Sequence, residues 1–407
     1  MAHAATPPAS GDQAVINLTV VEETRHRPPL WRDVRVLRAV IQVLAGAAVF
    51  MVLYVLWFNL TNNLRASGLP TGFDFLTQPL GVDIPGSDIS PSAPIWRGLL
   101  NGVKNTLALV VVGIPLLTII GVLVGVARLS TNWLVAKAAG VYVEILRNIP
   151  PLLIIFFVFN AVVLRFPVLQ ESLNLSDLVI VNNRYLAIVG FTAQPNFGPF
   201  LLIMAVALIV AAGVWWWRTR RSEQTGVPHH RFLWALGVFT ILTLIGFFAL
   251  GGPIGLSQPI LDGRALEGGY TGLAAYWAVL AALVLYTASH VAEIVRGSIL
   301  AVPRGQTEAA NAIALTPFQR LRYVTLPQAM RIAIPPVISQ YLNFTKNTSL
   351  AIAIGYAEMT RITFQLIGNG QPAPQMIFLL MGGYLIFSLI ISLIVNVVNR
   401  RLQLVTR

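Results

Sequence analysis

Polar and charged side chains stand inside two long apolar stretches, and these residues have the clearest chemical potential in the chain. In the stretch 272–296, Tyr286, His290 and Glu293 recur at helical spacing on one face. In the stretch 332–356 the candidate polar residues include Gln340, Asn343, Lys346, Asn347, Thr348 and Ser349. Charged groups at membrane depth are costly and are usually functional or paired. We predict that these faces line a path for a polar solute. The alternative is that they hydrogen-bond between helices and hold a bundle together.

A second set of residues lies in the polar segment 302–328, between these two stretches. Its first part is rich in alanine, which has high helix propensity and little side-chain bulk, and comprises Arg304, Gly305, Gln306, Thr307, Glu308, Ala309 and Ala310. A short helix of this kind can lie closely in a groove on a partner. A second helix is expected to begin with Thr316 as N-cap and Gln319 completing a capping box, and to end at Pro327.

No residue pattern supports an enzyme active site or a metal site. Cysteine is absent, and the five histidines lack zinc-type spacing. A phosphate-binding loop requires Gly-Lys followed by Ser or Thr, whereas Lys104, Lys137 and Lys346 follow Val, Ala and Thr. We therefore predict that the chain is not an enzyme and holds no cofactor or metal.

The elements that position these residues are predicted to be membrane-spanning helices. The sequence is 56% hydrophobic and 11% charged, where a soluble domain has about 25% charged residues, and its mean hydropathy is +0.72. Runs of roughly 20 apolar residues can span a bilayer. Eight such spans are expected, near 36–60, 98–127, 138–164, 199–217, 232–251, 272–296, 332–356 and 376–398. Residues 1–35 are polar, without the pattern of a cleavable signal, so the first span is expected to remain.

The distribution of basic residues predicts the orientation. With both termini in the cytoplasm, nineteen Lys and Arg residues fall in inner segments and six in outer segments, in agreement with the positive-inside rule. The net charge of +12 follows from this bias and does not indicate nucleic-acid binding.

The segment 302–328 resembles the EAA loop of ABC importer permeases, in which Glu-Ala-Ala is followed by a Gly and later by a hydrophobic residue and Leu-Pro. Glu308, Ala309, Ala310, Leu326 and Pro327 match this pattern, and Ala314 stands where the Gly is usual. The resemblance implies that the loop docks on a separate ATPase subunit. Alanine at 314 is expected to make the turn more rigid without abolishing docking.

Further motifs at 101–106, 142–152, 290–297 and 341–350 resemble polar amino acid permeases, and the added spans resemble the permeases of general L-amino acid importers of the Aap/Bzt type. This resemblance implies an all-α integral membrane protein with the five-helix core of type I ABC importers. The expected parts are a cytoplasmic segment 1–35, an extra span and loop 36–97, core 98–164, an inserted helix pair with loops 165–271, and core 272–407.

The implied function is the permease subunit of an ATP-driven amino acid importer in the bacterial inner membrane. The implied partners are a second permease, a dimeric ATP-binding subunit that holds ATP and magnesium, and a periplasmic amino-acid-binding protein. On the path, Lys346 with Asn343 and Asn347 is expected to favour the substrate carboxylate, and Glu293 to favour the ammonium or balance Lys346. The alternatives are an ion-coupled secondary amino acid transporter, and a structural or sensory subunit that transports nothing. The amino acids carried and the role of the inserted pair remain open.

Overall fold

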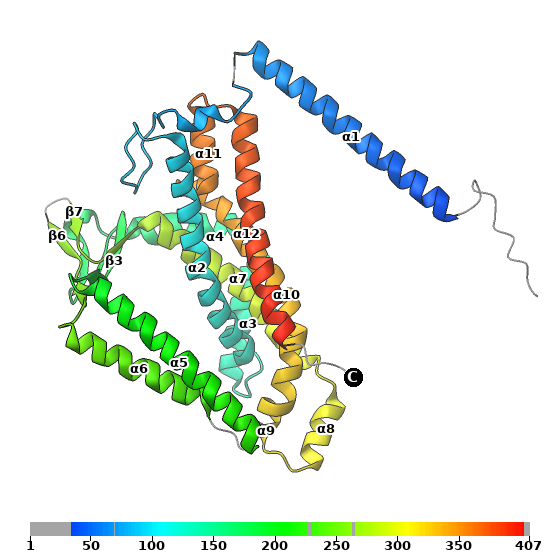
Figure 1. The fold of residues 1–407 in the computed structure, drawn as a ribbon, viewed down its shortest axis with the longest axis vertical. Helices are drawn as coiled ribbons and strands as arrows, with labels where there is room; N and C mark the ends of the chain where they lie inside the picture. Colours follow the sequence, from blue (N-terminus) through cyan, green and yellow to red (C-terminus); the bar gives the residue numbers. More distant parts are fainter. Residues whose placement is uncertain (1–33, 69, 227–229, 263–264, 403–407) are drawn as a thin grey trace, which may run out of the picture. The chain divides into compact units, whose positions relative to one another are not determined.

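The computed structural model describes residues 34–68, 70–226, 230–262 and 265–402. The chain divides into two compact units, Met1–Thr71 and Gly72–Arg407, which are treated separately below. The described part of the first unit contains one long apolar helix, α1 (Val34–Ala66), whose residues from Val36 onward are long and apolar enough to span a membrane (Figure 1). Most of the predicted N-terminal segment 1–35 lies outside the described residues.

Six helices in the described residues have the length and apolarity of membrane spans. Besides α1 they are α2 (Ile95–Ala127), α5 (Phe197–Thr225), α6 (Arg231–Ala249), α7 (Ala274–Leu300) and α12 (Ala373–Leu402). These correspond to six of the eight predicted spans, and the helical membrane fold is confirmed.

The predicted span 138–164 is not one straight helix. It consists of α3 (Trp133–Asn148) and α4 (Pro151–Phe157), with a π-helical turn Val158–Val162 and a 3-10 turn Val163–Arg165, and it bends by 107° at the break. Ile149 and Pro150 have extended backbones there. The reason is steric, because a residue that precedes proline is disfavoured in the α-helical region. Counted as one span, this pair brings the total to seven.

The predicted span 332–356 consists of α10 (Leu326–Asn347) and the 3-10 turn Thr348–Ile354. Its mean hydropathy is lower than that of the other spans, because α10 contains three prolines, Arg331, Lys346 and several amides. Pro335 and Pro336 lie inside the helix, which continues through them. After it come α11 (Met359–Gly368) and α12.

The region between the two core segments contains strands that were not predicted. Residues 165–271 were expected to be a helix pair with loops, but eight short strands flank α5 and α6 in the described residues. They are β1 (Leu173–Leu175), β2 (Val179–Val181), β3 (Tyr185–Ile188), β4 (Gly190–Ala193), β5 (Ile254–Ser257), β6 (Ile260–Asp262), β7 (Ala265–Glu267) and β8 (Tyr270–Leu273). The order β1-β2-β3-β8 forms an antiparallel sheet, and β4-β5 and β6-β7 form two-stranded pairs.

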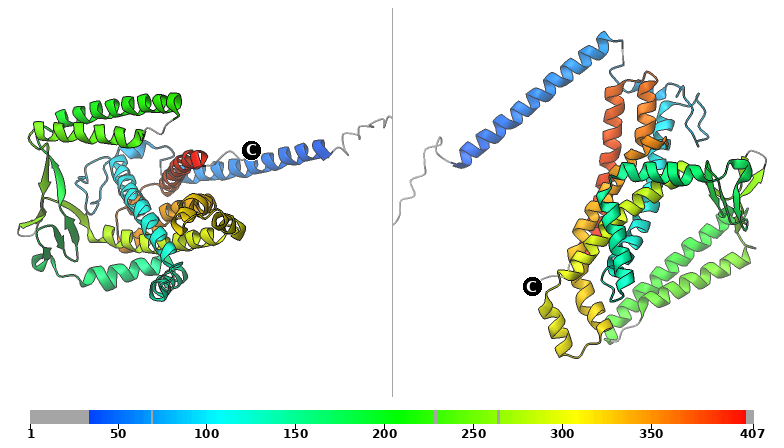
Figure 2. Two further views of the ribbon diagram at one scale, coloured as in Figure 1. Left: turned by 90° about the horizontal axis from the view of Figure 1, so that it is seen from below. Right: turned by 180° about the vertical axis from the view of Figure 1, so that it is seen from behind.

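The strands join the inserted helices to the core. Each strand has only three or four residues, which is too short for a clear alternating pattern in the sequence. Helices α5 and α6 lie side by side, as both views of Figure 2 show. The strands lie at the end of this pair where α5 begins and α6 ends (Figure 1).

The core of the second unit forms around α7, the most buried of the candidate spans. Its fully buried side chains include Leu283 and Val291, which pack with Leu109 and Leu117 of α2 and Phe344 of α10. Small residues let α2 approach α7 closely, as in other membrane helix pairs. A Cβ added at Gly125 would lie 2.7 Å from the Ala292 carbonyl oxygen, so only glycine fits there.

A second cluster of buried residues covers the opposite end of α2. Phe75 in the 3-10 turn Asp74–Thr77, together with Leu80, packs on Ile362, Leu366 and Met376 of the C-terminal part. The loop before α2 is therefore folded onto the core.

Candidate functional site: the coupling loop and a charged cluster

The segment after α7 folds into α8 (Arg304–Ala312) and α9 (Pro317–Arg320). Thr316 caps α9, since its Oγ1 accepts the N–H of Gln319 at 3.3 Å and the Gln319 Oε1 accepts the N–H of Thr316 at 2.9 Å. The predicted capping box is confirmed. The Arg320 guanidinium donates to the Asn311 Oδ1 at 2.8 Å and connects the two short helices.

The turn between these helices has a left-handed residue at Ala314, with φ +57°. The Ala314 N–H donates to the Asn311 carbonyl at 2.9 Å, and the Leu315 N–H to the Ala310 carbonyl at 3.1 Å, so the turn satisfies the last carbonyls of α8. Glycine adopts this conformation without a Cβ penalty, which explains why the EAA pattern has Gly here. Alanine adds strain at this point, where only greater rigidity was expected.

Ala314→Gly is therefore expected to stabilise the turn by about 1 kcal/mol, because an L-residue in the left-handed region costs roughly that amount. Hydrogen exchange of the backbone amides at 314 and 315 in the assembled transporter should slow by about fivefold. The control Ala309→Gly lies inside α8 and should speed exchange, since glycine in a helix interior costs about 1 kcal/mol relative to alanine. Faster exchange in Ala314→Gly would show that alanine is not strained.

The exposed face of α8 carries most of the predicted coupling residues. Glu308 and Ala309 are exposed, whereas Ala310 is 3% exposed and packs within this chain. The other predicted residues of this helix, Arg304, Gly305 and Gln306, are exposed, and Thr307 is half-buried. At the tip of the loop Ile313 and Phe318 are 72% and 68% exposed. This apolar, uncovered tip is the kind of surface that a partner covers.

The prediction that Pro327 ends the second helix is wrong. Helix α9 continues through a π-helical turn, Leu321–Thr325, directly into α10, where Leu326 and Pro327 are the first two residues. Pro327 has no N–H to donate, so one backbone hydrogen bond is missing where the π-helical turn passes into α10. The Gln328 Nε2 donates to the Gln306 Oε1 at 3.1 Å, so α8 is held against the start of α10.

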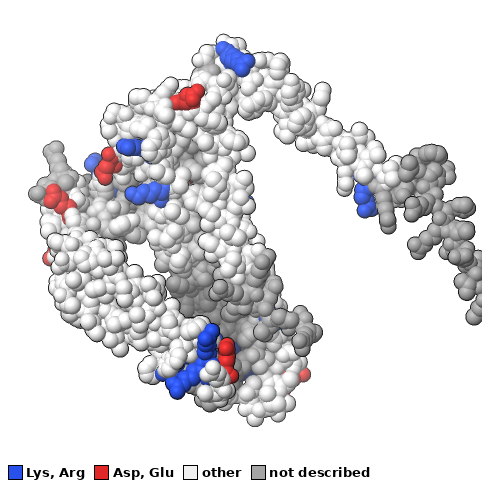
Figure 3. Space-filling model, in the orientation of Figure 1, with Lys and Arg blue, Asp and Glu red and all other residues white. Residues whose placement is uncertain are grey.

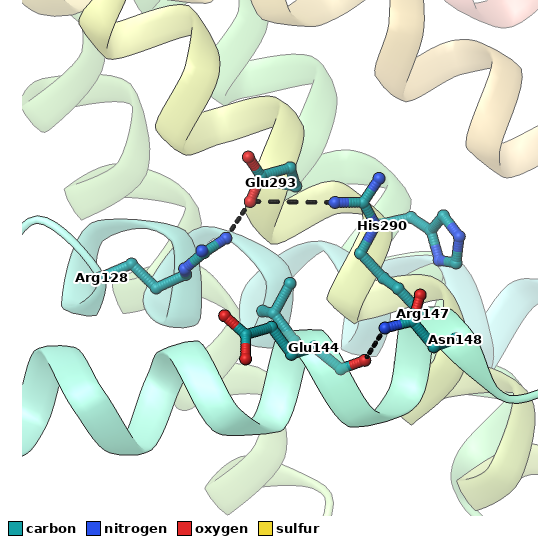
Figure 4. Close-up of a pocket in the computed structure, with 7 residues that line it drawn as sticks. Arg128, Glu144, Arg147, Asn148, His290 and Glu293 are labelled. Atoms are coloured by element: carbon teal, nitrogen blue, oxygen red, sulfur yellow. Dashed lines mark hydrogen bonds and ion pairs between the residues drawn. The ribbon is translucent and has the colours of Figure 1, made fainter.

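A cluster of charged side chains surrounds Glu293, about two turns before the end of α7 (Figure 4). The Arg296 Nη2 lies 2.6 Å from the Glu293 Oε1, and Arg128 forms an ion pair with the Oε2. The Arg147 Nη1 is 3.9 Å from the same Oε2. Helices α2, α3 and α7 each supply a partner, because Arg128 follows α2 directly and Arg147 lies in the last turn of α3.

The cluster borders a cavity of about 320 Å³, lined by Arg128, Val143, Glu144, Arg147, Asn148, His290 and Glu293. The Asn148 Nδ2 donates to the Glu144 carbonyl at 2.7 Å, and the His290 Nδ1 lies 3.1 Å from the Tyr286 carbonyl. The cavity therefore presents cationic and anionic side chains together.

Positive charge is in excess around the cavity, since three guanidinium groups face only Glu293 and Glu144. Burial is the main cause that lowers the pKa of Arg128, and the charge of Arg296 contributes. The guanidinium remains protonated. The lowered pKa therefore indicates that the Arg128 cation is partly desolvated and lies near a second positive charge, that of Arg296. An additional carboxylate would be stabilised in such a field.

The predicted path residues separate into two groups. Tyr286, His290 and Glu293 lie on α7, and the last two line the charged cavity. On α10, Asn343 and Lys346 are exposed and Gln340 and Asn347 are half-buried. Thr348 is fully buried and donates to the Thr345 carbonyl at 2.7 Å, and Ser349 donates to the Lys346 carbonyl at 2.8 Å.

The prediction that the charges of Glu293 and Lys346 pair with each other is wrong for this structure. All three ion pairs within the described residues involve Glu293, and each partner is an arginine. The Lys346 side chain is exposed and joins none of them. Helical spacing placed each residue on a face of its own helix, but it could not show which faces meet.

Sequence reasoning did not identify Arg128, Glu144, Arg147 or Asn148 as residues of this site. One signal was present. The Glu-x-x-Arg pattern of Glu144 and Arg147 recurs at Glu293 and Arg296, and the two copies meet at this cavity. The similarity covers only residues 143–147 and 292–296, and five residues were too few to predict that contact.

Comparison with known proteins identifies the family. Residues 117–404 match the family described as "Binding-protein-dependent transport system inner membrane component". The general L-amino acid transport system permease protein AapQ of Rhizobium johnstonii is 40% identical over 88% of this chain and 91% of its own.

Two further relatives match over similar lengths. The putative amino-acid ABC transporter permease protein YhdX of Escherichia coli is 37% identical over 90% of this chain and 94% of its own. The permease protein BztB of Rhodobacter capsulatus belongs to a glutamate/glutamine/aspartate/asparagine transport system. It is 33% identical over 86% of this chain and 89% of its own. These matches confirm the predicted resemblance and the prediction that the chain is not an enzyme. The chain therefore belongs to the family of binding-protein-dependent transport system inner membrane components, as a multi-pass permease subunit of an ABC importer.

Proposed function

We propose that this permease carries amino acids, and that the charged cavity beside Glu293 is part of their path. The observation that supports the substrate class most directly is the combination of arginines and glutamates around about 320 Å³ of space. An amino acid carries a carboxylate and an ammonium, and both need partners once water is removed. The names of the three relatives point to the same class of substrate.

In this proposal the Glu293 network works as a gate. In the described structure the Glu293 carboxylate forms ion pairs with Arg128 and Arg296. A substrate carboxylate that enters the cavity competes for these guanidinium groups, and the ammonium is balanced by Glu293 or Glu144. Exchange of one carboxylate for another keeps every charge paired, so the substrate can pass without a large electrostatic cost.

The gate lies close to the coupling loop along the chain. Glu293 is seven residues from the end of α7, and only residues 301–303 separate that end from α8. A partner that moves α8 therefore acts on the helix that carries Glu293 and Arg296. ATP and magnesium are proposed to bind in that partner, an ATPase dimer, because this chain lacks a phosphate-binding loop.

The remaining partners and the location follow from the family. Importers of this kind work with an ATPase and a binding protein, and here we propose a second, different permease and a periplasmic amino-acid-binding protein. The location is proposed to be the bacterial inner membrane, with both termini in the cytoplasm. The support is the excess of nineteen basic residues over six.

The orientation can be tested by introduced cysteines, because the chain has none of its own. A membrane-impermeant maleimide added to the periplasmic side should label Ser257→Cys but not Glu223→Cys. The reverse pattern would contradict the orientation and leave the substrate class untouched.

The substrate class is tested by uptake. Proteoliposomes that contain the complete importer should take up labelled L-amino acids, and excess unlabelled amino acid should compete with them. The matching amines and carboxylic acids, each lacking one of the two charged groups, should compete poorly. Equal competition by either analogue would contradict the proposed pairing of both charges.

A further inference from the structure

The inserted helix pair ends in a cluster of arginines stacked on tryptophans, which neither the coupling loop nor the gate uses. The Arg220 guanidinium lies 3.9 Å from the ring centroid of Trp216, and that of Arg218 lies 4.2 Å from Trp234. Three wider contacts complete the set: Arg221 over Trp217 at 5.2 Å, Arg218 over Trp217 at 5.5 Å and Arg231 over Trp215 at 5.5 Å. All of them lie in the last turns of α5 or the first turn of α6.

These arginines carry charge that the described chain does not neutralise. Residues 197–249 contain four arginines and one acidic residue, Glu223, and no described ion pair involves any of the four arginines. The Arg218 Nε is buried without a hydrogen-bond partner within the described residues. Figure 3 shows the basic side chains gathered at the end of the pair, away from the strands.

The surface next to the cluster is apolar. Along α5 Ile209 is 71% exposed, and on α6 Leu233 is 63% exposed. Both helices are candidate membrane spans, so these side chains face hydrocarbon or another membrane protein. A ligand that matches both regions has an anionic end at the arginines and an apolar body along the helices.

We propose that this cluster, Arg218, Arg220, Arg221 and Arg231 with their tryptophans, binds the phosphate of an anionic phospholipid. Guanidinium groups bind phosphate through paired hydrogen bonds, and the rings below them fix their planes. A free phosphate shares the headgroup chemistry, but the exposed apolar faces beside the arginines favour the lipid. The inserted pair would then fix this subunit to anionic lipid, a role beyond transport itself.

The experiment measures phosphatidylglycerol that stays on the detergent-purified importer complex during repeated washing. The triple variant R218Q/R220Q/R221Q is expected to retain less phosphatidylglycerol by a factor on the order of 100, because each arginine contributes about fivefold to binding. Trp216→Leu, which keeps all charges, should lose about two- to fivefold because Arg220 loses its ring. The matched control Arg97→Gln removes an exposed arginine that stacks on Trp96 at 5.5 Å, at the start of α2, and should retain lipid like the parent.

Each other outcome would overturn the proposal. Equal retention in the parent, the triple variant and Trp216→Leu would show that the cluster holds no lipid. Release of phosphatidylglycerol by millimolar glycerol phosphate would assign the site to free phosphate. Loss of a protein subunit from the triple variant, with lipid retention unchanged, would assign it to an acidic protein partner. Trp216→Leu keeps the test valid if the triple variant fails to assemble.

Discussion

Ala309→Trp is expected to lower ATP-driven uptake at least tenfold while the protein still inserts into the membrane at normal levels. Ala309 is exposed on α8, so this chain tolerates the larger ring. A partner groove that fits an alanine-rich helix does not, because overpacking a close contact costs about 1–3 kcal/mol. Uptake by proteoliposomes, normalised to the amount of assembled permease, measures the effect.

Two controls separate docking from folding. Ala212→Trp places the same ring at an exposed position of α5 and should leave uptake unchanged. Ala310→Trp alters a residue that is 3% exposed and should lower the yield of folded protein instead. Full uptake by Ala309→Trp would contradict the docking role of α8.

Glu293→Gln is expected to lower both stability and uptake strongly, because it leaves three guanidinium groups without their shared carboxylate. Breaking a fully buried ion pair costs about 3–5 kcal/mol. The Glu293 side chain is 26% exposed, so roughly 1–3 kcal/mol is expected here. Thermal unfolding of the purified complex measures the first effect and initial uptake rates the second.

A double-mutant cycle gives the sharper result. Arg128→Gln combined with Glu293→Gln removes opposite charges together and should recover part of the stability that either change loses alone. Arg147→Gln is the matched control, because its 42% exposed side chain lies 3.9 Å from the carboxylate and an exposed pair of this kind contributes under about 1 kcal/mol. Additive losses in the double variant would show that the gate residues act independently.

The sequence predicted the features that depend on local patterns. Apolar length located six helices, and the residues Thr316 and Gln319 correctly indicated a capping box. Ala314 was recognised as a departure from the family pattern, but its strain depends on a backbone angle that the sequence does not contain. The bend after Asn148 was readable from the prolines that follow it, yet the apolarity of the whole segment masked it.

Features that depend on contacts between distant segments could not be predicted. Glu293 lies on the helix that was predicted, but two of its three partners come from other segments: Arg128 directly after α2, and Arg147 on α3. Lys346 seemed a suitable partner because it has the opposite charge and a similar apolar context. The short strands around α5 and α6 depend on pairing across up to about 90 residues, as for β3 with β8, and leave little periodic trace.

The central claim is that this chain forms the path of a transporter driven by a partner's ATPase, and the source of energy tests it most directly. Proteoliposomes containing the complete importer, ATP inside and binding protein outside should concentrate amino acid. Uptake should stop when ATP is replaced by a non-hydrolysable analogue, or when the binding protein is omitted, and should persist after ionophores collapse every ion gradient. Uptake that follows an imposed proton or sodium gradient without ATP would contradict the account.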